Sequence, residues 1–180
     1  MSGESKLVLD LGCGQNKKKG SIGVDLLSSA KPDVMHDLNK FPYPFESNTV
    51  DYVHMDNVLE HLNEPLDVLG EVHRILKPGG VAKIVVPYFR SVWAHIDPTH
   101  KHFFTVQSFI YFDSENKLSD KYKYVDYRYR VLRTVFNEDL DNGALRLPLV
   151  LFANRFPLKY EVYLSHLLPL DDLTFYIKKV

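Results

Sequence analysis

The chain has 180 residues, of which 45% are hydrophobic and 25% charged, and its formal net charge is −1. This composition excludes a wholly disordered chain and predicts a single domain over residues 1–180. The near-neutral charge provides no basic surface for nucleic acid, so no nucleic-acid partner is expected. No apolar run approaches the roughly 20 residues that span a bilayer, and the first residues lack an apolar signal segment. The single cysteine, Cys13, cannot form an intrachain disulfide, so we expect a cytoplasmic protein.

The first expected strand, over residues 7–11, ends in an acid and a glycine turn. The run Leu-Val-Leu-Asp-Leu is followed by Gly12, Cys13 and Gly14. A short apolar run closed by glycine is typical of a buried parallel strand whose loop lets the backbone approach a ligand. With Asp10 near the strand end, this D-x-G-x-G pattern suits a ligand that has a cationic or hydroxyl-rich part.

Two further short strands are expected soon after this turn, and each ends in an acid. Residues 21–27 contain Asp25, and residues 33–37 end at Asp37. Only ten residues separate Gly14 from Asp25, whereas parallel strands are usually joined by a longer crossover that contains a helix. We therefore expect the first crossover helix to be reduced or absent.

The middle of the chain predicts alternating strands and helices. Strands are expected at residues 50–55 and 81–87, separated by a helix that starts at Pro65 and stops before the Lys-Pro-Gly-Gly run at residues 77–80. The proline- and aromatic-rich residues 41–51 are expected to form a loop over the ligand side of the sheet. Apolar residues at helical spacing should face the sheet: Leu66, Leu69, Val72, Ile75 and Leu76.

The remainder of the chain is less regular. We expect a loop at residues 88–104, a short helix at 105–112, an exposed segment at 114–123, a half-buried strand at 124–136, helices at 145–156 and 160–168, and a last strand at 173–180. The tyrosine-rich residues 122–130 could stack on sugars or bases, but their alternation favours a strand. Phe152, Phe156 and Tyr163 could form a patch for a partner, and we favour core. Strands alternating with helices predict an α/β fold with a mostly parallel sheet.

Two parts of the sequence resemble motifs of class I S-adenosylmethionine-dependent methyltransferases. The Asp-Leu-Gly-Cys-Gly turn resembles the first motif, and residues 50–62 and 71–81 resemble the pattern S-F-D…V-L-E-H-L…R-V-L-K-P-G-G. The resemblance covers residues 7–87 well and the rest weakly. Its short first crossover is similar to that of a compact subgroup linked to cell-surface sugar biosynthesis. The resemblance implies a Rossmann-like sheet with a C-terminal antiparallel strand and S-adenosylmethionine as the cofactor.

The three strand-end acids are the expected centre of the cofactor site, because ligands of open α/β sheets lie at the carboxyl ends of the strands. Asp25 is assigned to the ribose hydroxyls, and Asp37 with Leu38 to the adenine. Asp10 is expected near the methionyl ammonium, and the resemblance places Asn57 at the same end. Each acid alone could be a simple turn residue. The predicted cofactor-binding residues are Asp10, Gly12, Cys13, Gly14, Asp25, Leu26, Asp37, Leu38 and Asn57.

A nicotinamide-binding site is the main alternative for the glycine turn. Its G-x-G-x-x-G fingerprint requires a third glycine, and this chain has Lys17 there. The missing crossover helix would also remove the helix N-terminus that holds a pyrophosphate. S-adenosylmethionine has no phosphate, so these departures favour it over a dinucleotide.

The loop after the fifth strand contains four possible metal ligands: His95, Asp97, His100 and His102. They could bind a transition metal, but their irregular spacing favours a wall of the substrate site, and no metal is predicted. His100 and His95 are the candidate catalytic residues, because histidine is a suitable general base at neutral pH. The alternative is that both histidines only hydrogen-bond the loop.

The sequence therefore predicts a methyltransferase that acts on a small-molecule or saccharide-like acceptor, with O-methylation favoured. No N-P-P-Y-type motif follows the fourth strand, where the chain has Met-Asp-Asn-Val at residues 55–58, so amino methylation of nucleobases or glutamine is not favoured. Two alternatives stay open. One is a non-catalytic protein that binds S-adenosylmethionine, and the other is a nucleotide-dependent oxidoreductase.

Overall fold

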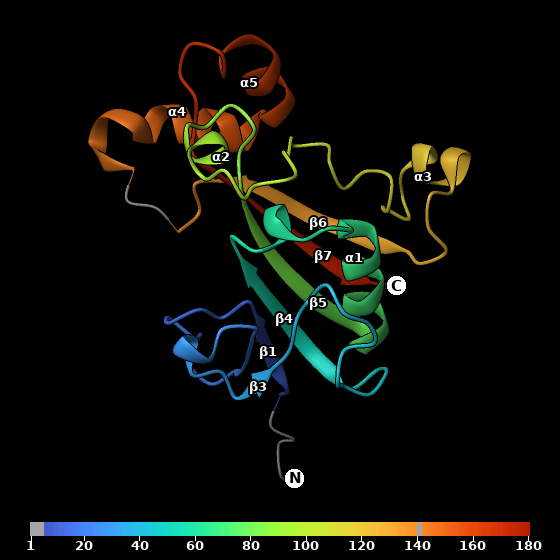
Figure 1. The fold of residues 1–180 in the computed structure, drawn as a ribbon. Helices are drawn as coiled ribbons and strands as arrows, with labels where there is room; N and C mark the ends of the chain where they lie inside the picture. The colour runs from blue at the N-terminus through green and yellow to red at the C-terminus, as the bar shows by residue number, and fades with distance from the viewer. Residues whose placement is uncertain (1–5, 140–141) are drawn as a thin grey trace, which may run out of the picture.

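Seven strands form one sheet at the centre of the computed structural model, which describes residues 6–139 and 142–180. The strands are β1 (Val8–Leu11), β2 (Ile22–Asp25), β3 (Val34–Met35), β4 (Val50–Asp56), β5 (Leu76–Pro87), β6 (Tyr129–Phe136) and β7 (Asp172–Lys179). Their order is β3-β2-β1-β4-β5-β7-β6 (Figure 1). The first five strands are parallel, and β7 is antiparallel to β5 and β6 on its two sides. The predicted α/β fold with a C-terminal antiparallel strand is confirmed.

Five α-helices accompany the sheet within the described ranges: α1 (Pro65–Ile75), α2 (Trp93–Ile96), α3 (Lys117–Tyr122), α4 (Gly143–Arg155) and α5 (Pro157–Tyr163). Helix α1 packs against the sheet, whereas α2, α4 and α5 gather beyond the carboxyl end of β5 (Figure 1). None of these helices combines the length and the apolar character needed to cross a membrane.

The connection from β1 to β2 contains turns and no helix, as predicted. The amides of Gly12 and Cys13 both donate to the carbonyl of Val24, at 2.7 and 3.2 Å, so the chain leaves β1 directly alongside β2. Farther along the connection, Lys17 forms an ion pair with Asp33 at 2.7 Å. Hydrogen bonds to the neighbouring strand thus replace the packing of a crossover helix.

Helix α1 buries an apolar stripe against the sheet, and two predicted members of that stripe are wrong. Leu76 is buried, but it is the first residue of β5, which begins before the strand expected at 81–87. Leu69, Val72 and Ile75 are buried as expected, together with Val68. Leu66 is 39% exposed. At about 100° per residue, Leu66 lies roughly a third of a turn from the centre of the buried stripe, so it cannot reach the sheet.

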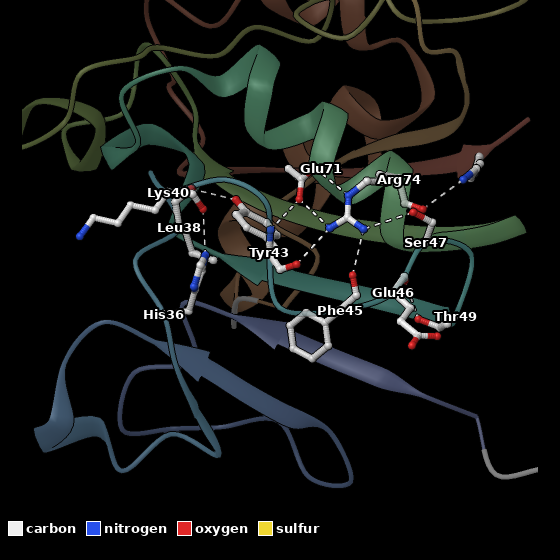
Figure 2. Close-up of polar contacts among 11 residues, drawn as sticks. His36, Leu38, Lys40, Tyr43, Phe45, Glu46, Ser47, Thr49, Glu71 and Arg74 are labelled. Carbon is white, nitrogen blue, oxygen red and sulfur yellow. Dashed lines mark hydrogen bonds and ion pairs between the residues drawn. The ribbon is translucent and has the colours of Figure 1, made fainter.

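The segment 41–49 packs along α1 and not over the ligand side of the sheet, so the predicted position of this loop is wrong. Figure 2 shows the guanidinium of Arg74 donating to the carbonyls of Phe45 and Tyr43, at 2.9 and 3.1 Å. Glu71 pairs with Arg74 at 2.7 Å and accepts the amide hydrogen of Tyr43 at 2.7 Å. The two side chains satisfy backbone groups that no strand or helix partner satisfies.

Three expected elements of the second half also differ from the structure. The strand expected at 124–136 begins only at Tyr129. Residues 105–112 form successive turns and no helix, whereas the expected exposed segment at 114–123 contains α3. Asn116 caps α3 by accepting the amide hydrogen of Leu118 at 3.0 Å. An Asn cap preceding a short polar helix is a local signal that outweighs the low hydrophobicity of this segment.

The core prediction for the aromatic residues of α4 and α5 is wrong. Phe152 and Phe156 are 37% and 41% exposed, and Tyr163 is 69% exposed. The two helices contribute Val150, Ala153 and Tyr160 to the core instead. Because α4 and α5 lie at one end of the sheet and not across its face, only a narrow side of each helix is buried (Figure 1).

Candidate functional site

The carboxyl ends of β1 and β2 bring the glycine turn and Asp25 together. One carboxylate oxygen of Asp25, Oδ2, accepts the amide hydrogen of Gly14 at 2.9 Å, and Oδ1 accepts that of Leu27 at 2.9 Å. Asp25 is only half-buried, so lone pairs of both oxygens remain available to a ligand. The structure therefore joins two residues that the sequence assigns to one site.

The two glycines of the turn have different surroundings. Gly12 has a φ of +73°, and a Cβ there would lie 2.4 Å from Cγ2 of Val58. Gly14 has a φ of +49°, and no atom of the described residues lies within 4 Å of the position that its Cβ would take. The positive φ favours glycine at both positions. One side of the turn is thus pressed against the segment after β4, and the other side is open to a ligand.

The other two strand-end acids have partners within the protein. Asp10 is buried, and its Oδ2 accepts the amide hydrogen of Lys18 at 2.7 Å. Asp37 is half-buried, and the hydrogen bond from the amide of Asn39, at 3.0 Å, lowers the pKa of its carboxyl. Both acids therefore stabilise their turns, whatever else they bind.

The remaining predicted cofactor residues lie around the same strand ends. Cys13 is buried, and burial followed by the nearby charge of Asp10 raises the pKa of its thiol. Leu26 is 58% exposed beside Asp25, whereas Leu38 is buried. Asn57 follows β4 with a φ of +53°, and its amide donates to the carbonyl of Val85 at 3.0 Å.

A cavity of about 620 Å³ opens next to Asn57, at the carboxyl ends of β4 and β5. Polar side chains dominate one part of its lining: Glu60, His61, Asp97, His100, Arg146, Asp171 and Asp172. Trp93 and Ile96 of α2 line another part. Asn57 is the predicted cofactor residue that also lines the cavity, so the cavity adjoins the expected methyl-donor end.

His100 faces this cavity, and His95 does not. The Nδ1 of His100 lies 3.0 Å from the carbonyl of Ala94, and its Nε2 lies 4.0 Å from Oε1 of Glu60. His95 lines a different pocket, and its Nε2 lies 2.9 Å from the carbonyl of Phe89. The two candidate bases, His100 and His95, therefore face different pockets.

The four possible metal ligands of the histidine loop do not converge on one point. His102 points to the carbonyl of Leu62, at 2.9 Å from Nε2, and His95 is turned toward Phe89. Asp97 accepts the hydroxyl hydrogen of Thr99 at 2.7 Å. The loop supplies its side chains to several neighbours because backbone carbonyls there need donors.

Five ionisable residues of the cavity were missed as site candidates: Glu60, His61, Arg146, Asp171 and Asp172. Glu60 is 1% exposed, and burial, followed by the charges of Asp56 and Asp172, raises its pKa to about 8. Burial and then the neighbouring charge of Asp171 raise the pKa of Asp172 to about 6. The V-L-E-H motif after β4 contains Glu60 and could have indicated it as a site residue. No comparable signal exists for Asp172, because its position depends on the pairing of β7 with β5.

Comparison with known proteins agrees with this geometry. The family model described as "Methyltransferase domain" matches residues 9–84, from β1 into β5. Residues 9–84 therefore resemble a methyltransferase domain. The matched segment contains the glycine turn, Asp25, Asn57 and Glu60, whereas the histidine loop lies after it. No curated protein matches the chain significantly.

Solved structures share the fold of this chain at low sequence identity. A chain from the complex of the Haloferax volcanii Trm112 methyltransferase activator with a methyltransferase has a TM-score of 0.60 and 20% identity, and the match covers 98% of this chain and 83% of that chain. An Archaeoglobus fulgidus SAM-dependent methyltransferase has a TM-score of 0.58 and 20% identity, covering 98% and 87%. The [4+2]-cyclase SpnF has a TM-score of 0.57 and 16% identity, covering 97% and 74%.

The match of residues 9–84 to a methyltransferase domain implies S-adenosylmethionine as the cofactor. The residues at the strand ends fit it. The open side of Gly14 leaves room for a close approach of the ligand, and Asp25 offers carboxylate oxygens for hydroxyl groups. The helix-free connection from β1 to β2 lacks the helix N-terminus that a dinucleotide pyrophosphate would use.

Proposed function

We propose that this methyltransferase methylates an oxygen of a small, hydroxylated, saccharide-like acceptor held in the cavity beside Asn57. The observation that carries this proposal is the position of the cavity, which is lined by acids and a histidine at the end of the predicted cofactor site. Carboxylates and imidazoles are suitable partners for the hydroxyl groups of such an acceptor. The resemblance to the subgroup linked to cell-surface sugars is consistent with a saccharide-like acceptor.

For the cofactor, we propose the contacts that the sequence assigns. Asp25 accepts the ribose hydroxyls, Asp37 and Leu38 contact the adenine, and Leu26 lies beside the ribose. Asp10, Asn57 and the turn formed by Gly12, Cys13 and Gly14 surround the methionyl end. When bound, S-adenosylmethionine supplies an electrophilic sulfonium methyl group, and the protein supplies orientation and exclusion of water.

His100 is the proposed general base. Its Nδ1 faces the carbonyl of Ala94, which fixes the proton on Nδ1 and leaves the lone pair of Nε2 toward the cavity. The acceptor hydroxyl would give its proton to Nε2 while its oxygen bonds to the methyl carbon. The methyl–sulfur bond would break in the same step and leave its electron pair on the sulfur of S-adenosylhomocysteine. His95 carries no role in this proposal, because it faces a separate pocket.

The test is release of S-adenosylhomocysteine in the presence of a panel of sugars and other small hydroxylated compounds. His100→Ala should retain S-adenosylmethionine binding and reduce turnover by about 10²- to 10⁴-fold, the usual contribution of a general base. The matched control is His95→Ala, which should keep its turnover. A fully active His100→Ala variant would remove His100 as the base.

A non-catalytic protein that binds S-adenosylmethionine is the second candidate. The similarity to a cyclase shows that this fold is not confined to proteins named as methyltransferases. Tight binding of the cofactor without turnover of any hydroxylated acceptor would favour this candidate. A single domain, a cytoplasmic location and the lack of a nucleic-acid partner stay predictions from the sequence.

A further inference from the structure

One carboxylate and two imidazoles meet in the lining of the large cavity. One ligating atom from each of Glu60, His61 and His100 lies within 4.8 Å of the other two. Oε1 of Glu60 and Nε2 of His100 are 4.0 Å apart, and the two imidazole rings have centroids 4.6 Å apart. These three residues differ from the four possible metal ligands of the histidine loop. Only His100 belongs to both groups.

The hydrogen bond of His100 determines which of its ring nitrogens carries a proton. Nδ1 lies 3.0 Å from the carbonyl oxygen of Ala94, which can only accept, so Nδ1 is protonated and donates. In the neutral ring, Nε2 then has a free lone pair, and this atom faces Glu60. A histidine ligand of a metal ion typically has this arrangement, with its other N–H donated to a carbonyl or carboxylate.

The same reasoning applies to His61. Its Nδ1 lies 2.9 Å from the hydroxyl oxygen of Thr99, and that hydroxyl donates its single hydrogen to Asp97 at 2.7 Å. The Thr99 oxygen can therefore only accept from His61, so Nδ1 of His61 is protonated. Nε2 of the neutral ring is again left with its lone pair.

The side-chain carboxyl group of Glu60, beside the two imidazole rings, has no hydrogen-bond partner among the described residues. Glu60 is 1% exposed, and neither of its side-chain oxygens has a hydrogen-bond partner within residues 6–139 and 142–180. Within the same residues, the one ion-pair contact of this group is with Nε2 of His100, at 4.0 Å from Oε1. A buried polar group without a partner is unfavourable by about 1–3 kcal/mol and requires an explanation.

We propose that Glu60, His61 and His100 bind a divalent first-row transition-metal ion of the Zn²⁺ type at the wall of the cavity. Two neutral imidazoles and one carboxylate form a donor set that Zn²⁺ and its neighbours prefer. In a tetrahedral zinc site, bonds of about 2.1 Å place the ligand atoms about 3.4 Å apart, close to the Glu60–His100 separation. Three protein ligands leave a fourth position open toward the cavity, as in catalytic zinc sites.

The metal site would change the role of His100 in methyl transfer. Nε2 would be a metal ligand and not a free base, and the ion would lower the pKa of an acceptor hydroxyl bound at the open position. This consequence rests on the proposed function. The metal site itself does not, because it is argued from the three side chains and their partners alone.

The experiment uses the full chain, stripped of metal with a chelator, without S-adenosylmethionine or acceptor. Zn²⁺ is titrated by calorimetry, and Co²⁺ by the visible absorption of its ligand-field bands. We expect one ion per chain. Glu60→Gln and His100→Ala should each weaken binding at least about tenfold, whereas His95→Ala, from the same loop but outside the cluster, should bind as the wild type does.

Thr99→Val provides a second variant that does not depend on a buried residue. Thr99 is exposed, and valine removes the acceptor that fixes His61. Loss of such a supporting group typically weakens metal affinity about 10- to 100-fold, and we expect that range here. Thermal unfolding of each metal-free variant checks that it is folded.

Binding that is the same in the wild type, Glu60→Gln, His100→Ala and Thr99→Val would overturn the metal site. So would a wild-type chain that binds neither ion. Either result would leave the proposed function intact if S-adenosylmethionine still binds and an acceptor is still methylated. Conversely, a bound metal ion without any methyl transfer would support the site and reject the proposed function.

Discussion

At the scale of single residues, Gly12 and Gly14 differ in the space beside them, and this difference is measurable. Gly12→Ala would place a methyl group 2.4 Å from Val58 at a φ of +73°, so steric overlap adds to backbone strain. We expect the free energy of unfolding to fall by about 2–5 kcal/mol. Gly14→Ala meets no neighbouring atom and should reduce it by only about 1–2 kcal/mol. Urea unfolding of both variants tests the order, which equal losses would contradict.

Asp25 is the residue on which the proposed cofactor contacts depend most. Each hydrogen bond to a charged group contributes about 1.5–3 kcal/mol, so Asp25→Ala should weaken S-adenosylmethionine binding by at least tenfold. Asp25→Asn retains a side-chain oxygen that can accept the Gly14 amide hydrogen and should have an intermediate affinity. Calorimetry measures both variants. Unchanged affinity in Asp25→Ala would reject the ribose assignment.

Asp172 predicts a dependence of stability on pH. Its pKa rises from 3.8 to about 6 on folding, so the folded chain binds more protons than the unfolded chain between these values. Stability relative to Asp172→Asn should therefore fall as the pH rises from about 4 to about 6, and stay lower above pH 6. We expect Asp172→Asn to be more stable by about 1–3 kcal/mol at pH 8 and equal at pH 3. Urea unfolding at both pH values provides the comparison, and a constant difference would contradict it.

The sequence could place Asp25 beside the glycine turn because both follow strands that end at one edge of a parallel sheet. It could not place Glu60 against His100, since these residues are 40 positions apart and meet only through the path of the histidine loop. It also could not separate His95 from His100, because the direction of each side chain is set by which backbone carbonyl it reaches.

At the scale of elements, Arg74 and Glu71 attach the segment 41–49 to α1 (Figure 2). Arg74→Ala would leave the carbonyls of Tyr43 and Phe45 without this donor and Glu71 without its ion-pair partner. We expect the free energy of unfolding to fall by about 2–4 kcal/mol.

The matched control is Arg130→Ala. Arg130 forms an ion pair with Glu115 at 2.9 Å, but both side chains are more than half exposed. Its loss should change stability by no more than about 0.5 kcal/mol. Urea unfolding measures both variants, and equal effects would show that Arg74 does not hold the segment.

Local signals determined which elements could be predicted. The apolar runs of β1, β4 and β5 and the proline at the start of α1 gave correct elements, because each signal lies within the element itself. The position of segment 41–49 could not be predicted, since it depends on Arg74 and Glu71 about 30 residues later. The exposure of Phe152 and Phe156 likewise depends on where α4 lies relative to the sheet, which periodicity does not specify.

At the scale of the whole molecule, the sheet joins strands that are distant in the sequence. Strand β7 pairs with β5 and β6 and brings Asp172 opposite Pro87, at the edge where the cavity opens. The antiparallel position of β7 was expected only from the resemblance to methyltransferases. Hydrophobic patterns identify strands, but they do not show which strands pair. The predicted cofactor residues all lie within residues 9–84, and the lining of the cavity is completed by the later chain.

The central claim is that the strand ends bind S-adenosylmethionine and not a dinucleotide. Parallel calorimetric titrations of the purified chain with S-adenosylmethionine, S-adenosylhomocysteine and NADH test it most directly. We predict saturable binding of the first two compounds with one site per chain, and no binding of NADH. Binding of NADH alone, or of none of the three, would contradict this account of the site.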